Sequence, residues 1–193
     1  MQLKNDRLNT NSVTTVNGTD DRGAHPKRWI ALLVQVRSEK AVGKKLTDLN
    51  IENYVPTQWE IHQWSDRKKK VERVVIPMVV FARVDKFEEI QTRNLSLIYK
   101  VVTYPGRYEA ATIPENQIET LKYMLKHADQ TVEMKERILE VGDRIRIARG
   151  PLKDLEGELF LVDTDKPMIA VRIECLGYAC VSIDKSDVEL INA

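Results

Sequence analysis

The densest group of residues suited to binding chemistry lies in the stretch QWSDRKKKVERVVIP, residues 63–77. Trp64 is followed by four consecutive cations, Arg67, Lys68, Lys69 and Lys70. Lysine and arginine neutralise phosphate charges, and an indole ring can stack on an unpaired base. The cluster therefore indicates a contact with nucleic acid, although a solvated hairpin tip explains the same residues equally well. Phosphate contacts position a protein without specifying a sequence, so no target sequence follows.

Residues able to support catalysis or to bind a metal are few and scattered. The histidines, His25, His62 and His127, have no partner at a spacing that suits a metal site. We expect Cys175 and Cys180 to be reduced, buried and structural, because the chain shows no export signal. Glycine-rich nucleotide-binding patterns are missing. The sequence predicts a protein that is not an enzyme, with no catalytic residue, metal site or cofactor.

Charge is distributed unevenly along the 193 residues, although the net charge is only +1. Residues 28–128 carry 17 Lys and Arg against 12 Asp and Glu, whereas residues 129–193 carry 9 against 14. Such a division favours two surfaces with different partners, the basic one meeting nucleic acid, unless it is ordinary scatter in surface charge. No apolar run reaches the length of a membrane span. We expect a cytoplasmic protein with no membrane contact.

The elements that must position the cations alternate between strand and helix. Residues 1–27 lack a periodic apolar pattern and are expected to form a disordered tail. Apolar runs predict strands at 29–36, 53–60, 71–84 and 97–104. Amphipathic stretches predict helices at 38–50, 86–93 and 114–127. The polar segment 61–70 is expected to be a loop, and Pro56 and Pro77 to interrupt their strands. Residues 28–128 should thus form an α+β sandwich, with three helices on a largely antiparallel sheet.

Helix ends and faces can also be predicted. Ser38 and Asp85 are the expected N-caps of the first two helices. The expected buried face of the first helix is formed by Val42, Leu46 and Leu49. That of the third is formed by Ile118, Leu121, Met124 and Leu125.

The last third of the chain changes character. Residues 129–138 lack strand signals and carry alternating charges, so we expect a linker with some helical tendency. In residues 139–193, five short alternating runs separated by turn residues predict a five-stranded barrel. It begins with VGDRIRIARGPLKDLEGEL, residues 141–159, in which Ile145 and Ile147 share a face and Gly157 permits a close backbone approach.

The glycine spacing of this stretch resembles the KOW motif of NusG-type transcription elongation factors. The residues that carry the likeness are Gly142, Asp143, Ile145, Ile147, Gly150, Pro151, Leu152, Leu155 and Gly157. The preceding domain resembles the N-terminal (NGN) domain of the same family. It shares an opening Trp29 before an apolar strand, an Arg-x-Glu-Lys element at 37–40, Val55-Pro56 and an apolar-Pro strand at Ile76-Pro77.

The resemblance implies binding to RNA polymerase. In the family an apolar depression receives the clamp helices of the largest subunit, and the matching residues are Trp29, Ile76, Pro77, Val79 and Phe81. Burial in an ordinary core is the alternative for these side chains. The common Phe-Pro-Gly-Tyr pattern is replaced here by Ile-Pro-Met-Val, which loses the aromatic residue. Arg37 and Lys40 match positions that present cations to non-template DNA, and nascent RNA is a second expected nucleic-acid partner.

Two phrases, QWSDRKKKVERVVIP and ATIPENQIETL, are similar to UpxY-type paralogues of capsule-forming Bacteroidales. This likeness implies a monomeric antitermination factor that acts on long operons, commonly those for surface or capsular polysaccharide. In relatives the barrel docks on a ribosomal protein or another factor, and Leu152 replaces a common Phe there. The barrel is expected to remain β. The alternative is a housekeeping NusG-type factor or a ribosome- or RNA-binding KOW protein.

Overall fold

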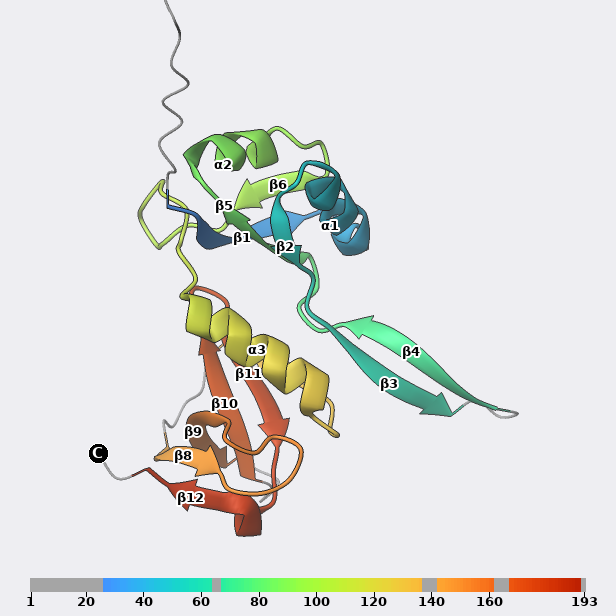
Figure 1. Ribbon diagram of the computed structural model, residues 1–193, viewed down its shortest axis with the longest axis vertical. Coiled ribbons are helices and arrows are strands. Elements are labelled where there is room, and N and C mark those ends of the chain that lie inside the picture. The colour runs from blue at the N-terminus through green and yellow to red at the C-terminus, as the bar shows by residue number, and fades with distance from the viewer. Residues whose placement is uncertain (1–25, 64–66, 137–141, 162–166, 192–193) are drawn as a thin grey trace, which may run out of the picture.

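The computed structural model describes residues 26–63, 67–136, 142–161 and 167–191. In these residues a domain of helices and strands is followed by a domain made almost entirely of strands (Figure 1). This confirms the α+β class and its division into an NGN-type sandwich and a KOW-type barrel. Residues 1–25 of the expected tail at 1–27 lie outside the described residues, and so does Trp64.

A four-stranded antiparallel sheet forms the centre of the first domain. Its strands run in the order β2 (Glu52–Tyr54), β5 (Val79–Val84), β1 (Arg28–Val34) and β6 (Ile98–Val101). β1 is apolar on both faces because both are covered. Ile30, Leu32 and Val34 share a buried cluster with Val42 and Leu46 of helix α1. The side chains that alternate with them belong to a second cluster, which reaches into the barrel.

Three helices complete this domain, close to the predicted limits: α1 (Glu39–Asp48), α2 (Lys86–Arg93) and α3 (Glu115–His127). The predicted stripe of α3 is confirmed, because all four of its apolar side chains are buried. The prediction for α1 holds at Val42 and Leu46 but is wrong at Leu49, which is 45% exposed. Leu49 lies beyond the last helical residue, and Asn50 then turns the chain with a positive φ of 57°.

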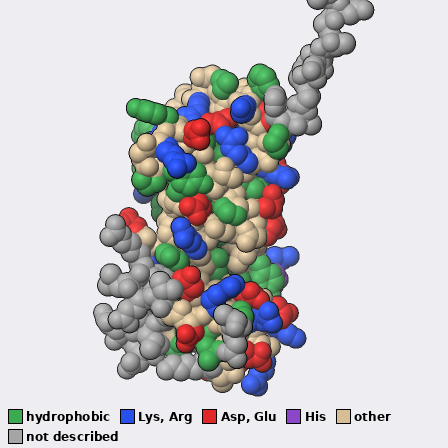
Figure 2. Space-filling view, turned by 90° about the vertical axis from the view of Figure 1, so that its left-hand side faces the viewer, with side chains coloured by type: hydrophobic (Ala, Val, Ile, Leu, Met, Phe, Trp, Pro, Cys, Tyr) green, Lys and Arg blue, Asp and Glu red, His purple; other side chains and the backbone are tan. Residues whose placement is uncertain are grey.

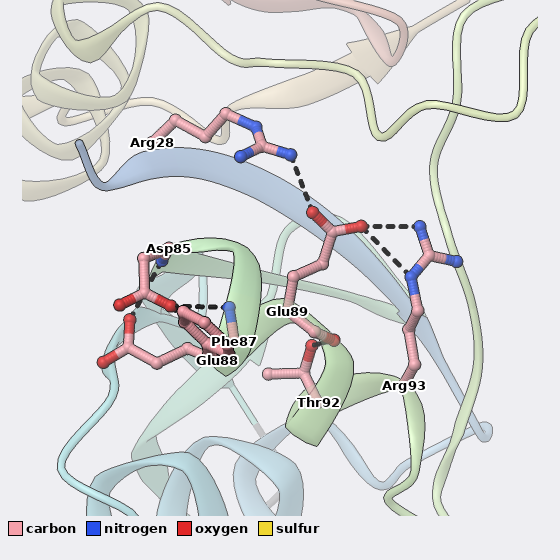
Figure 3. A network of polar contacts seen from close by, with 7 residues as sticks. All are labelled: Arg28, Asp85, Phe87, Glu88, Glu89, Thr92 and Arg93. Atoms are coloured by element: carbon pink, nitrogen blue, oxygen red, sulfur yellow. Dashed lines mark hydrogen bonds and ion pairs between the residues drawn. The ribbon is translucent and has the colours of Figure 1, made fainter. Parts of the chain in front are cut away.

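Helix α2 is fixed at its start by the predicted cap (Figure 3). Asp85 Oδ1 accepts hydrogen bonds from the amides of Phe87 and Glu88 at 2.8 and 2.9 Å, and Glu88 Oε2 accepts from the amide of Asp85 at 3.0 Å. This capping box satisfies amides that have no partner inside the helix. Glu89 joins the helix to β1 through an ion pair with Arg28 at 2.7 Å.

A separate two-stranded ribbon replaces the predicted loop at 61–70. β3 (Thr57–Gln63) and β4 (Lys68–Val74) pair in antiparallel register, and Figure 1 shows them extending away from both domains. The predicted strand 53–60 is likewise wrong as one element, because the chain breaks at Pro56 and its halves enter different sheets. Lysines are uncommon in strands, but side-chain contacts between cross-strand pairs, such as Ile61 with Lys70, stabilise the strand conformation here.

The second domain is a six-stranded antiparallel sheet of barrel type. Its order is β12 (Val188–Leu190), β8 (Arg144–Ile147), β9 (Glu156–Leu161), β10 (Pro167–Ile173), β11 (Gly177–Ser182) and β7 (Glu133–Lys135). β7 lies in the segment expected to be a linker with helical tendency, so that expectation is wrong for these three residues. Met134 pairs with Ala179 of β11, whose edge selects the strand conformation. A short 3-10 helix, Lys185–Asp187, precedes β12.

Helix α3 lies between the sheet of the first domain and the barrel (Figure 1). Toward the sheet, the Lys122 ammonium lies 5.1 Å from the ring centre of Trp29. Toward the barrel, Tyr123 Oη donates to the carbonyl of Lys153 at 2.8 Å, and Gln117 Oε1 accepts from the amide of Glu174 at 2.7 Å. The two domains are therefore in direct contact through α3.

Candidate binding surfaces

The five residues matched to polymerase binding lie together, and most are buried. Trp29, Ile76, Val79 and Phe81 have exposed fractions of 1%, 6%, 3% and 0%, and all four belong to the cluster that includes α3 and the barrel. Pro77 is exposed on the turn between β4 and β5. The residues thus form one contiguous apolar group, of which the turn is the accessible part.

Polar contacts hold α3 over this apolar group. Trp29 Nε1 donates to Glu115 Oε1 at 3.0 Å, so the buried indole N–H has a hydrogen-bond acceptor on α3. Lys122 also lies 5.6 Å from the ring centre of Tyr54, which stacks on Phe81 with centroids 6.3 Å apart. Burial, with a smaller contribution from nearby Glu119, raises the pKa of Tyr54 well above its usual range. An enclosed aromatic layer therefore separates α3 from the sheet.

The turn that carries Pro77 is positioned by Glu39, whose contribution was not predicted. Glu39 is 6% exposed, and its Oε1 accepts a hydrogen bond from the amide of Met78 at 2.8 Å. Met78 has a φ of 63°, a conformation that non-glycine residues seldom adopt. The Glu of the Arg-x-Glu-Lys element thus holds the backbone of the turn rather than facing solvent.

Arg37 and Lys40 lie on the surface at the start of α1. Arg37 is exposed with a positive φ of 62°, which directs the chain from β1 into the helix. Lys40 is exposed too, but its ammonium pairs with Glu72 at the base of the ribbon. Hydrogen bonds from Lys40 and Thr57 lower the pKa of Glu72, so this carboxylate stays ionised and neutralises Lys40.

The ribbon carries the predicted cations and one residue that sequence reasoning missed. Arg67, Lys68, Lys69 and Lys70 are all exposed. Trp59 on β3 is 58% exposed, and the Lys70 ammonium lies 5.2 Å from its ring centre. Side chains alternate between two faces along residues 57–63, so Trp59 lies on the face opposite the buried Gln58. This alternation is the sequence signal that could have identified Trp59 as exposed. The structure thus brings an aromatic ring to the cations independently of Trp64.

The KOW-type residues shape the barrel from within. Ile145 and Ile147 are 0% and 2% exposed, as their alternation predicts. A Cβ on Gly157 would lie 2.6 Å from the carbonyl oxygen of Ala170, which confirms the predicted close approach. Leu152 and Leu155 lie in the segment between β8 and β9, but they are 7% and 3% exposed and belong to the core.

The other KOW-type residues set the ends of the same strands. Gly150 has a φ of 88° and starts the turn that Pro151 continues. A Cβ on Gly142 would collide with the backbone of Leu159, so this position also requires glycine. Asp143 lies beside it, where its carbonyl accepts from the Leu159 amide at 2.9 Å. The motif therefore describes backbone geometry more than an exposed docking surface.

The thiols differ from each other. Both cysteines are free, and Cys180 is buried as predicted, but Cys175 is exposed, so the prediction is wrong there. Cys175 sits in the β10–β11 turn with a φ of 60°. Burial raises the pKa of the Cys180 thiol to about 11. Within the described residues, no group of three or more His, Cys, Asp or Glu side chains could hold a metal ion, and no helix could cross a membrane.

Charges on the far side of the molecule are mixed. Figure 2 views the side that faces away from the ribbon, and there Lys and Arg side chains are interspersed with Asp and Glu. A mixed surface of this kind provides little attraction for a polyanion. The run of four cations on the ribbon contrasts with it.

Comparisons with known proteins give one family match and several structural similarities. Residues 27–122 match the family model described as "Transcription termination factor nusG". Among solved structures, the chain is similar to NusG of Thermotoga maritima, with 18% identity over 86% of this chain and 98% of that one, at a TM-score of 0.46. It is also similar to a chain of the MjSpt4:Spt5 complex, with 15% identity over 84% and 97%, at a TM-score of 0.28. No curated protein matches significantly.

Residues 27–122, just under half of the chain, therefore match a NusG family domain, and this match rests on the family model. A barrel-type domain that resembles a KOW domain follows this region. A role of the whole chain in transcription elongation or antitermination is therefore a proposal.

Proposed function

We propose that the protein is an antitermination factor that binds RNA polymerase and promotes read-through of long operons, specifically operons for surface or capsular polysaccharide. The observation that carries the proposal is the NusG family domain at residues 27–122, followed by a KOW-type barrel. The similarity of residues 63–77 and of ATIPENQIETL to UpxY-type paralogues supports the operon class.

The proposed polymerase contact is the apolar group of Trp29, Ile76, Pro77, Val79 and Phe81. Apolar side chains can receive a helix in a groove through non-directional burial, at about 25 cal/mol per Å² of apolar surface before association costs. Four of the five are buried beneath the layer of α3 and the barrel. The proposal therefore requires that layer to move when polymerase binds, with Pro77 as the first accessible contact.

Nucleic acid exposed on the polymerase surface is the proposed second partner. Arg37 and the ribbon cations are exposed, and they lie on adjoining elements because Lys40, which follows Arg37 at the start of α1, pairs with Glu72 of β4. Lys40 contributes to this contact only where a phosphate replaces Glu72 as its partner. We assign the barrel to contact with a ribosomal protein or another factor rather than with nucleic acid. Its residues belong to the acidic part of the chain, which repels phosphate.

Affinity capture with the full chain as bait tests the proposal against its alternative. We expect RNA polymerase subunits to be retained with the wild-type chain and less so with Pro77→Asp, which places a charge on the exposed turn. A matched control is Pro105→Asp, because Pro105 lies on another exposed turn. Recovery of ribosomal RNA without polymerase would instead favour the ribosome- or RNA-binding KOW protein.

A further inference from the structure

The β3–β4 ribbon has two unlike faces, which alternation along each strand separates. Gln58, Glu60 and Arg73 lie on the face that packs against the chain after α3. Gln58 Nε2 donates to the carbonyl of Gln130 at 2.8 Å, and its Oε1 accepts from the amide of Val132 at 2.9 Å. Arg73 bonds Glu60 at 2.5 Å and the Val132 carbonyl at 2.9 Å. This face anchors the ribbon.

The opposite face, defined by Trp59, Ile61, Lys68 and Lys70, points away from the anchor. The register places Ile61 opposite Lys70, and Trp59 opposite Glu72. Trp59 is 58% and Ile61 72% exposed. Large apolar side chains in such exposed positions mark an interaction surface when they adjoin one another. We call these four residues the open ribbon face.

We infer that the open ribbon face binds single-stranded nucleic acid, with a base stacked on Trp59 and phosphates held by Lys68 and Lys70. The inference deepens the nucleic-acid contact of the proposed function and rests on that part of it. Charge identifies a polyanion as the occupant, because Glu72, the acid opposite Trp59, is already paired with Lys40. The lysines of this face therefore keep their attraction for phosphate.

The apolar residues of the same face select unpaired bases over a duplex. A two-stranded ribbon fits the major groove, but the groove presents base edges, which polar side chains read. Trp59 and Ile61 offer flat and apolar contact area instead, and a base exposes its ring face only when it is unstacked. Lys68 and Lys70 lie two residues apart on one strand face, about 7 Å along the strand, which suits successive phosphates of an extended chain.

The test measures binding of fluorescent fifteen-residue oligonucleotides, dT and rU, to the full chain without polymerase. We expect Trp59→Ala to weaken binding roughly tenfold. Tyr99→Ala, an exposed aromatic residue on β6, should leave binding unchanged. Comparison of dT with rU shows whether DNA or RNA is preferred, and either preference supports the inference.

The lysines are tested by two variants that remove equal charge. We expect K68Q/K70Q to lower the slope of log K against log salt by about 1.4, at about 0.7 per phosphate. R67Q/K69Q should weaken binding less, because Lys69 lies on the anchored face. Equal losses in both variants, wild-type affinity in Trp59→Ala, or equal binding of a duplex would each overturn the inference.

Polymerase capture by the same variants keeps this test separate from that of the proposed function. Trp59→Ala should retain polymerase as the wild type does while losing the oligonucleotide. Loss of polymerase together with wild-type oligonucleotide affinity would assign the open ribbon face to a protein contact and overturn the inference.

Discussion

Two residues that were both predicted to be helix N-caps differ in the hydrogen bonds that they make. Ser38 and Asp85 both occupy the N-cap position of their helix. The Asp85 carboxylate accepts two backbone hydrogen bonds, whereas the Ser38 side chain makes no cap hydrogen bond. Ser38 follows Arg37, whose positive φ sets the entry into α1 by backbone geometry. The position of a cap can thus be predicted from sequence, but its use depends on the preceding backbone.

The contrast predicts unequal costs of substitution. Asp85→Ala should lower the free energy of unfolding by about 1 kcal/mol, because the amides of Phe87 and Glu88 lose their acceptor. Urea unfolding followed by circular dichroism measures this change. Ser38→Ala is the matched control and should change stability by less; an equal loss in both variants would contradict the cap assignment.

The two thiols should differ in reactivity because the thiolate is the reactive form. Cys175 is exposed, and burial raises its pKa above the ordinary value, so its labelling should accelerate only as the pH rises past that value. Cys180, with a pKa raised to about 11, should react after unfolding. Labelling with an aromatic disulfide reagent between pH 7 and pH 10 should show one fast thiol, which Cys175→Ser removes. Two fast thiols in the folded chain would contradict the structure.

At the scale of elements, periodic patterns predicted the three helices and the central strands, because each carries its own apolar face. The ribbon and β7 were missed for a common reason. Lys68 to Lys70 and Glu133 to Lys135 are rich in charge, and tertiary pairing supplies their stability. Of the binding surfaces, the cations and the apolar group could be predicted from residue type. To predict that Trp59 lies beside the cations, the strand register must be known. To predict that Trp29 is buried, the position of α3 on the sheet must be known.

Anchoring of the ribbon through Gln58 can be measured. Gln58→Ala removes the acceptor of the Val132 amide and the donor to the Gln130 carbonyl in a site where Gln58 is 4% exposed. Leaving buried groups unpaired should lower the free energy of unfolding by about 1–3 kcal/mol. Gln63→Ala, on the same strand but exposed, is the control. Thermal unfolding at the same midpoint for both variants would contradict the anchor.

At the scale of the whole molecule, α3 joins the two domains and covers the apolar group. Its bonds to the barrel, from Tyr123 and Gln117, are interdomain contacts of ordinary strength, each worth about 1 kcal/mol. Besides these bonds, α3 and the barrel share one buried apolar cluster, so displacement needs a partner that buries more apolar surface. The strength of the domain contact should therefore affect the proposed binding of polymerase.

Weakening this contact should favour polymerase capture. The double variant Q117A/Y123F removes the hydrogen bonds that these two side chains make to the barrel, and we expect several-fold more polymerase to be retained on the chain at subsaturating concentration. Thr120→Ala is the control, because the Thr120 hydroxyl bonds within α3 to the Asn116 carbonyl. Equal or reduced capture by Q117A/Y123F would show that the layer need not open.

Read-through is the proposed activity, and transcription of a long operon template measures it directly. Purified RNA polymerase is run on a template with a terminator near the promoter and a distal reporter segment, with and without the full chain. We expect more distal transcript when the chain is present, and less of this gain with Pro77→Asp. Unchanged distal transcript, in a reaction where the chain is shown to bind polymerase, would contradict the account.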